Sequence, residues 1–211
     1  GRSGIEERDD IKETVKKNAL TRKLLAAETL GSVDVICSDK TGTLTEGVMR
    51  LEKIISIQND YTLSTLSSDK KDYQLADFIK TFQAGILCNN AILGKEGNKD
   101  VGSALEIAFL KAATNFQIDT SKYLKNSSRL DEMPFNSSRK FMISLHKEDD
   151  GFVVYEKGAG EIILDKCTKI QEDGKIREIT QKDIEKIKAN YEKMTSSGLR
   201  VIALAFKSLK E

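Results

Sequence analysis

Residues 39–45 read D-K-T-G-T-L-T, and only Ser38 separates them from the short run V-D-V-I-C at residues 33–37. That run is β-branched and mostly apolar, which predicts a buried strand leading into a glycine-containing loop. A carboxylate at the C-terminal end of such a strand can attack a phosphoryl group, while backbone N–H groups of the loop hold the phosphoryl oxygens. Asp39 is therefore the candidate nucleophile.

Attack by Asp39 on a polyanion requires neutralisation of charge, which Lys40 and a magnesium ion could supply. The alternative is an ordinary turn, in which Asp39 only starts the turn and Gly42 allows a positive φ. A lone Asp-x-x-Gly would favour that alternative. Seven residues in this order, directly after an apolar strand, favour the phosphoryl site.

The seven residues resemble the signature of the P-type ATPases without a mismatch. The resemblance implies that Asp39 forms an aspartyl-phosphate from ATP, and that Lys40 and Thr43 help to hold the phosphoryl group. It also implies a magnesium site to which Asp39 contributes its carboxylate and Thr41 a backbone oxygen. ATP as substrate and Mg²⁺ are thus the expected ligands.

Two alternatives stay open. Phosphatases of the haloacid dehalogenase type have a second aspartate two positions after the nucleophile, where it acts as general acid and base. Here that position is Thr41, which does not readily activate water at neutral pH. The other alternative is a non-catalytic nucleotide-binding module, against which the intact D-K-T-G-T-L-T counts.

The segment G-S-A-L-E at residues 102–106 is similar to the G-x-x-T-E stretch of the family, with Leu105 in place of threonine. In the family the glutamate lies beside the adenine amino group, which implies that role for Glu106. Ser103 and Glu106 also have the spacing of a capping box, so Glu106 could simply cap its own helix. The segment L-C-N-N-A at residues 87–91 resembles another part of the same domain.

Residues 134–142, P-F-N-S-S-R-K-F-M, resemble the F-x-x-x-x-K-x-M segment of the family. The resemblance implies that Phe135 stacks on adenine and that Lys140 meets phosphate oxygens. Phe135 could instead belong to the core, the commoner location of a phenylalanine. Calcium pumps usually have an arginine where Ser137 stands, so Arg139 could supply that phosphate contact.

Residues 157–161, K-G-A-G-E, resemble the K-G-A-P-E motif, with Gly160 in the place of proline. The resemblance implies that Lys157 points into the nucleotide pocket and that Gly158 lets backbone approach the ligand. Arg200, at the start of an apolar run, matches a phosphate-contacting arginine. Otherwise Lys157 would be a solvated strand end.

The expected fold is mixed α and β. Residues 1–27 are expected to form a linker, with a helix over 11–30 by apolar spacing, and residues 28–47 the first strand and loop of a Rossmann-like phosphorylation domain of haloacid dehalogenase type. Residues 48–207 are expected to form the nucleotide-binding domain, an antiparallel sheet flanked by helices, and 208–211 a hinge remnant.

Within the nucleotide-binding domain, periodicity and capping signals predict three helices and a set of strands. One helix is predicted over residues 75–86, and a second begins at Ser103. A third covers residues 180–194 and begins with Thr180 and Asp183. The strands cover residues 49–57, 141–146, 152–156 and 200–207, and the second and third are expected to form an antiparallel hairpin.

Composition limits the partners. Lys plus Arg number 34 against 33 Asp plus Glu, so the net charge of +1 gives no reason to expect nucleic acid. The three cysteines, at positions 37, 88 and 167, form no C-x-x-C pair and fit reduced thiols. The single histidine, His146, is expected to be surface or packing.

No apolar run is long enough to span a membrane, so a soluble, monomeric chain is expected on the cytoplasmic side of a membrane protein. Its expected partners are adenine nucleotide and the transmembrane, actuator and remaining phosphorylation domains. The later T-G-D and G-D-G-x-N-D segments of the family are absent, so nucleotide binding without turnover is expected. Calcium is the leading candidate for the ion.

Overall fold

The computed structural model describes residues 33–35, 37, 48–66, 76–94, 98–148 and 151–209. The chain divides into two compact units, Gly1–Gly47 and Val48–Glu211. In the first unit, residues 33–35 and 37 are exposed and form no strand, so the predicted buried strand is wrong at these positions. A buried strand needs hydrogen-bonding neighbours, and no described strand pairs with them. The predicted helix over 11–30 and the loop at 39–45 lie outside the described residues.

The second unit contains helices and antiparallel strands, as predicted. In chain order the described elements are β1 (Lys53–Ile55), β2 (Asp60–Thr62), α3 (Ala76–Leu87), α4 (Ala104–Asn115), α5 (Thr120–Asn126), β3 (Ser128–Asn136), β4 (Phe141–Glu148), β5 (Gly151–Gly158), α6 (Gly160–Leu164), β6 (Lys169–Glu172), β7 (Lys175–Glu178), α7 (Gln181–Ser196) and β8 (Ala203–Leu209). The described part of the chain has no helix that is both long and apolar enough to cross a membrane.

The central sheet has four antiparallel strands in the order β3-β4-β5-β8. The β4–β5 hairpin runs in register from Glu148 opposite Gly151 to Phe141 opposite Gly158, which confirms the predicted hairpin. The final strand begins at Ala203 rather than at residue 200, because its last partner is Gly158, where β5 ends.

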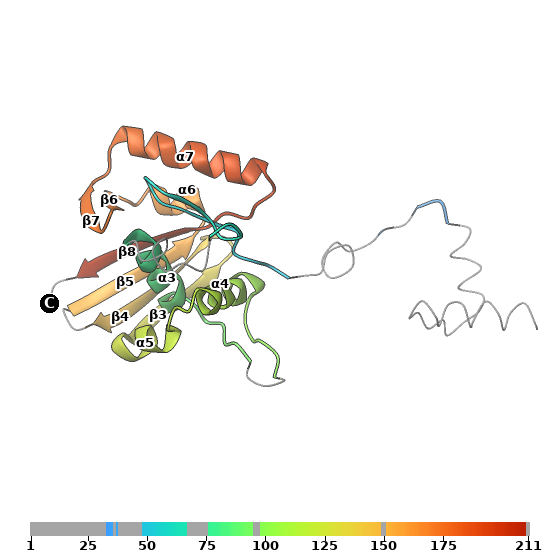
Figure 1. Ribbon diagram of the computed structural model, residues 1–211, viewed down its shortest axis with the longest axis horizontal. Coiled ribbons are helices and arrows are strands. Elements are labelled where there is room, and N and C mark those ends of the chain that lie inside the picture. Colours follow the sequence, from blue (N-terminus) through green and yellow to red (C-terminus); the bar gives the residue numbers. More distant parts are fainter. Residues whose placement is uncertain are drawn as a thin grey trace, which may run out of the picture. The chain divides into compact units, whose positions relative to one another are not determined.

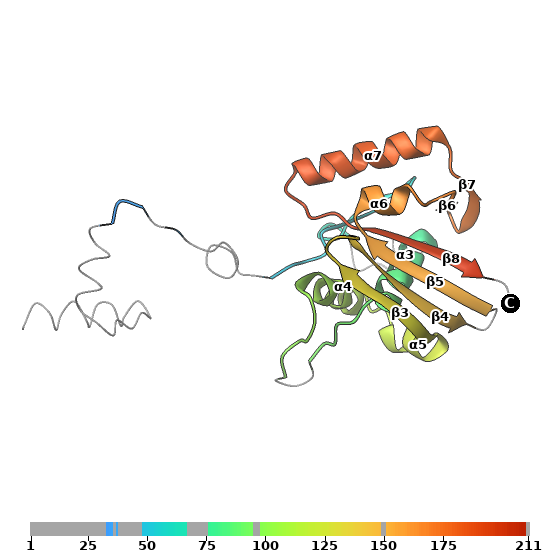
Figure 2. The ribbon, with the colours of Figure 1, turned by 180° about the vertical axis from the view of Figure 1, so that it is seen from behind.

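Helices α3, α4 and α5 cover one face of this sheet, and α6 and α7 lie beyond its β8 edge (Figures 1 and 2). Helix α3 is central, because its two sides enter two different clusters. Phe78 and Phe82, both fully buried, pack with Phe109 of α4. Leu87 packs with Met142 and Tyr155 of the sheet. Burial of each such side chain stabilises the fold by about 1.5 to 3 kcal/mol.

Helices α3 and α4 approach closely at Gly85, where a Cβ atom would overlap the ring of Phe109. The capping residues predicted from the sequence are confirmed. Ser103 caps α4, and Thr180 with Asp183 forms a complete capping box on α7.

The predicted strand over residues 49–57 is only partly correct, because the strand β1 covers three of these residues. A turn follows at once, in which the Ser56 amide donates to the Asn59 carbonyl at 2.8 Å and the Asn59 amide donates to Ser56 Oγ at 3.2 Å. The Ser and Asn side chains favour such turns. The chain therefore reverses into β2 instead of continuing.

Candidate functional site

Glu106 lies in the first turn of α4, where a carboxylate is favoured by the helix dipole. The hydroxyl of Ser103 accepts a hydrogen bond from the Glu106 amide at 3.3 Å and donates one to Glu106 Oε2 at 2.8 Å. Ser103 therefore caps α4, whereas the Glu106 side chain contacts the Ser103 hydroxyl and not the Ser103 backbone amide of a complete capping box. This contact engages only one of the two carboxylate oxygens, so Oε1 is left for other contacts.

Lys157 supplies the main contact of that second oxygen. Its Nζ lies 2.7 Å from Glu106 Oε1, and the two side chains are only 9% and 13% exposed. Lys157 is paired with Met142 on β4 and shares the helix-covered face with Tyr155, because alternate residues of a strand face the same side. The alternative of a solvated Lys157 is therefore wrong.

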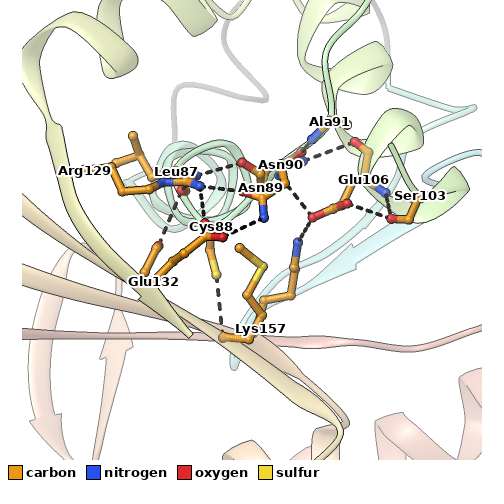
Figure 3. A network of polar contacts seen from close by, with 12 residues as sticks. Leu87, Cys88, Asn89, Asn90, Ala91, Ser103, Glu106, Arg129, Glu132 and Lys157 are labelled. Carbon is orange, nitrogen blue, oxygen red and sulfur yellow. Dashed lines mark hydrogen bonds and ion pairs between the residues drawn. The ribbon is translucent and has the colours of Figure 1, made fainter. Parts of the chain in front are cut away.

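The loop after α3 completes the surroundings of Glu106 (Figure 3). The backbone amide of Asn90 donates to Glu106 Oε1 at 3.1 Å, and the side-chain Nδ2 of Asn89 donates to the Glu106 backbone carbonyl at 3.2 Å. This loop, α4 and β5 are distant in sequence, and they meet at one carboxylate.

Two opposing effects set the pKa of Glu106. Burial alone would raise this pKa, but the Lys157 ammonium, the Ser103 hydroxyl and the Asn90 amide outweigh burial and hold the pKa below its ordinary value. Glu106 is therefore a carboxylate at neutral pH. A buried ion pair needs such additional hydrogen bonds, because desolvation of both charges is costly.

Phe135 lies at an irregularity of β3, between the pairs that Met133 and Asn136 make with β4. Its side chain is 57% exposed, so the alternative of a core phenylalanine is wrong. Because β4 separates β3 from β5, and strands lie about 4.8 Å apart, the Phe135 backbone is roughly 10 Å from that of Lys157. An exposed aromatic ring at this end of the sheet is available to a ligand.

Lys140 closes the turn between β3 and β4 and adopts a positive φ of 61°. Its carbonyl accepts a hydrogen bond from Ala159 at 3.0 Å, and its Nζ lies 3.8 Å from a carboxylate oxygen of Glu161. Gly158 packs against the same carbonyl, since a Cβ atom at Gly158 would lie 2.5 Å from the Lys140 oxygen. The close backbone approach that requires this glycine is to the turn of Lys140.

Arg139, considered as a replacement for a missing phosphate contact, donates to the Pro134 carbonyl at 3.3 Å within its own turn. Arg200 is exposed and lies between α7 and β8, three residues before the first pair of β8. Gly160 stands where proline is usual in the family, and here the ring of Tyr191 fills the space that a Cβ atom would need.

A cavity of about 790 Å³ lies at a different place, between residues 49–57, α3, α4, α6, α7 and the start of β8. Of the predicted site residues that the structure describes, only Arg200 lines it. Its walls are mainly apolar and do not include the Glu106–Lys157 pair. Size alone would select this cavity, but the charged groups that a nucleotide requires converge at Glu106 and Lys157, and we place the candidate site there.

The remaining predicted residues, Asp39, Lys40, Thr41 and Thr43, lie outside the described residues. The predicted phosphoryl and magnesium sites therefore stay predictions. Among the residues that the structure does describe, no group of three or more His, Cys, Asp or Glu side chains is arranged to hold a metal ion.

Sequence reasoning did not identify Arg129, which holds the loop after α3, nor a role for Asn89 and Asn90 beyond a family resemblance. The paired asparagines after a helix indicate a cap or turn. They predict the loop but not its contact with Glu106. Arg129 stands within a strand of mixed residues, and no sequence pattern connects it to residues 87–90.

Comparison with known proteins identifies the family to which this chain belongs. Residues 77–211 match the family described as P-type ATPase, cytoplasmic domain N. The chain therefore belongs to the P-type ATPase family, and the predicted resemblance is confirmed.

Several curated relatives are similar over almost the whole chain. Calcium-transporting ATPase 1 of Bacillus cereus is 35% identical over 197 residues, which cover 93% of this chain and 21% of that protein. Calcium-transporting ATPase 1 of Saccharomyces cerevisiae is 36% identical, with 93% and 22% covered. Potassium-transporting ATPase alpha chain 2 of Cavia porcellus is 34% identical, with 90% and 20% covered. The chain thus spans about a fifth of the length of these relatives.

Proposed function

We propose that this chain binds adenine nucleotide at the Glu106–Lys157 site, as the nucleotide-binding part of a cation-transporting P-type ATPase. The observation that carries the proposal is the buried ion pair, with Nζ and Oε1 2.7 Å apart. A buried carboxylate and ammonium, with an exposed aromatic ring at the same end of the sheet, combine the polar and apolar groups typical of a ligand site.

The free acceptor position of Glu106 supports adenine as the base. A carboxylate offers about four acceptor positions, and three of those of Glu106 are taken by Ser103, Lys157 and Asn90. One is left for a donor. Adenine has an amino group where guanine has a carbonyl oxygen, so Glu106 would accept from adenine and repel guanine.

The other predicted residues take complementary roles. Phe135 stacks on the base through its exposed ring. Lys140 contacts phosphate oxygens as a cation, Lys157 points into the pocket beside Glu106, and Arg200 is a further cation near the start of β8. Gly158 allows the turn that carries Lys140 to pack against β5.

For the whole protein, we propose ion transport across a membrane driven by ATP hydrolysis through an aspartyl-phosphate on Asp39. Lys40 and Thr43 would hold the phosphoryl group, and Asp39 and Thr41 would bind Mg²⁺, which would neutralise phosphate charge. This domain would lie on the cytoplasmic side. Calcium is the proposed ion, since two of the relatives reported above are named for calcium transport.

Amide NMR titration of the 211-residue chain with ATP tests the binding proposal. We expect shifts to cluster at Glu106, Phe135, Lys140 and Lys157, with a much weaker response to GTP. Phe135→Ala should weaken ATP binding by roughly fivefold, because aromatic stacking is worth about 0.5 to 1.5 kcal/mol. Leu130→Ala, an exposed side chain on the same strand, is the matched control. No response to millimolar ATP would refute nucleotide binding.

A further inference from the structure

Arg129 connects three parts of the second unit without contacting Glu106 or Lys157. It lies on β3, with its side chain 28% exposed. Its Nη2 donates to the carbonyl oxygens of Leu87 at 2.6 Å and Asn89 at 2.7 Å. Its Nη1 donates to Asn90 Oδ1 and to Glu132 Oε2, the latter at 2.8 Å. One guanidinium thus binds the last residue of α3 and the loop that follows it (Figure 3).

The end of α3 needs such a donor. The last carbonyl groups of a helix have no partner within the helix, and a cation is favoured at that end by the helix dipole. Leu87 is the last residue of α3. The planar guanidinium can reach two carbonyls and two side-chain oxygens together, which a lysine ammonium with three donors on a flexible stem cannot reproduce.

The loop that Arg129 holds is the loop that contacts Glu106. The Asn90 amide donates to Glu106 Oε1 at 3.1 Å, and the Asn89 side chain, by donating to the Glu106 carbonyl, ties the loop to α4. Glu132, on the same sheet edge, completes the arrangement by accepting from both Arg129 and Asn90. A displacement of this loop would change the direction of the Glu106 carboxylate.

We propose that Arg129 is a positioning residue for nucleotide binding: it fixes residues 87–90, and through the Asn90 amide it sets the orientation of Glu106 toward the base. The proposal rests on the proposed function, since it assigns a role in the same site. Arg129 itself touches no nucleotide. Its removal should therefore affect base discrimination as well as affinity.

Arg129→Lys tests the proposal because it retains the charge but loses the fork of donors. We expect ATP to bind roughly threefold to tenfold more weakly, which lies within the range for residues that act on a site through others. The preference for ATP over GTP should fall in parallel. The matched control is Arg177→Lys, which breaks an arginine network at β7 and α7. It should leave nucleotide affinity and base preference unchanged.

A second readout does not depend on added nucleotide. The pKa of the Glu106 carboxyl, followed by carbon NMR, should rise in Arg129→Lys because the Asn90 hydrogen bond contributes to its depression. It should not move in Arg177→Lys. If the wild-type chain binds no ATP, the proposed function fails, while the carboxyl titration still decides whether Arg129 orients Glu106.

The positioning role is overturned if Arg129→Lys and Arg177→Lys give the same ATP affinity, the same base preference and the same Glu106 titration. Asn90→Ala provides a second variant should Arg129→Lys fail to fold. It removes the Asn90 side-chain contacts with Arg129 and Glu132 but keeps the backbone amide. We expect a smaller loss of affinity in the same direction, and an unchanged affinity would also overturn the proposal.

Discussion

Two carboxylates of the second unit each lie in the first turn of a helix and pair with a cation. They differ in the number of hydrogen bonds that they accept. Asp183 of α7 accepts from Arg177 Nη1 and Nη2, at 2.7 and 3.0 Å, and from the Thr180 amide and hydroxyl, at 2.8 and 2.7 Å. Asp183 thus accepts four hydrogen bonds, three on Oδ2 and one on Oδ1. Glu106 of α4 accepts three such bonds from the described residues, two on Oε1 and one on Oε2.

This difference separates a structural network from a candidate site. Asp183 joins α7 to the β6–β7 hairpin, and Arg177 also contacts Glu172. The charged groups of this network therefore bind one another and hold neighbouring elements together. Glu106 lies beside a lysine that is 9% exposed, near an exposed phenylalanine, with an acceptor still available. A charged group that is fixed in position and still has an available acceptor position is the feature expected of a binding residue.

The largest expected effect comes from removing the buried cation. Lys157→Met leaves the Glu106 carboxylate buried without its counterion, and we expect the free energy of unfolding to fall by about 3 kcal/mol. Lys157→Met combined with Glu106→Gln should recover most of the loss. Urea unfolding at pH 7 measures both. Equal losses in the single and double variants would contradict a strong coupling between the two charges.

The second prediction concerns ligand binding. Glu106→Gln should weaken ATP binding by about tenfold, because a hydrogen bond to a charged group is worth about 1.5 to 3 kcal/mol and the amide retains part of it. Asp183→Asn changes the other carboxylate in the same way and should leave ATP affinity unaffected. Isothermal titration calorimetry compares the two. A loss of affinity in Asp183→Asn would remove the distinction between the networks.

The third prediction uses pH. The Arg177 guanidinium, followed by Thr180, holds the pKa of Asp183 well below its usual range. A carboxyl with a lowered pKa in the folded state stabilises the fold above its unfolded pKa of about 3.9 and loses that contribution as the pH falls below it. We therefore expect thermal stability to decrease from pH 5 to pH 3. Asp183→Asn should flatten this profile more than Glu106→Gln does.

The smallest expected effect lies at His146, a buried titratable group on the same sheet face as Lys157. Burial, together with Arg129, lowers its pKa. It is therefore neutral when folded, and stability should fall slightly as the pH drops through the unfolded value of about 6.5. His146→Leu should remove this slope between pH 7 and pH 5. Thermal unfolding at several pH values measures it, and an unchanged slope would refute the assignment to His146.

Local signals in the sequence predicted most of the regular elements of the second unit. The capping residues Ser103, Thr180 and Asp183 marked helix starts, and apolar periodicity located α3 and the β4–β5 hairpin. These features depend on residues within a few positions of each other. The short elements β2, α5, α6, β6 and β7 were not predicted, because so few residues carry little periodicity. The longer strand β3 was also missed, because it is exposed at almost every position and so lacks an alternation of buried and exposed residues.

The errors also have a common physical origin. The strand expected over residues 49–57 ends at a turn formed by Ser56 and Asn59, and the strand expected from residue 200 begins only where β5 offers a partner. The exposed residues 33–35 and 37 are apolar enough for a buried strand, yet no described strand pairs with them. In each case pairing with another segment, rather than local propensity, decided the outcome.

The sequence by itself determined the family, the mixed antiparallel fold and the identity of Glu106, Phe135, Lys140, Lys157, Gly158 and Arg200 as candidates. These follow from motifs and periodicity that are local in the chain. Only the tertiary structure decided that Glu106 meets Lys157, 51 residues later, at 2.7 Å, and that Arg129 holds the loop after α3 that contacts Glu106. Such contacts depend on which strands and helices pack together, and that is a property of the whole fold.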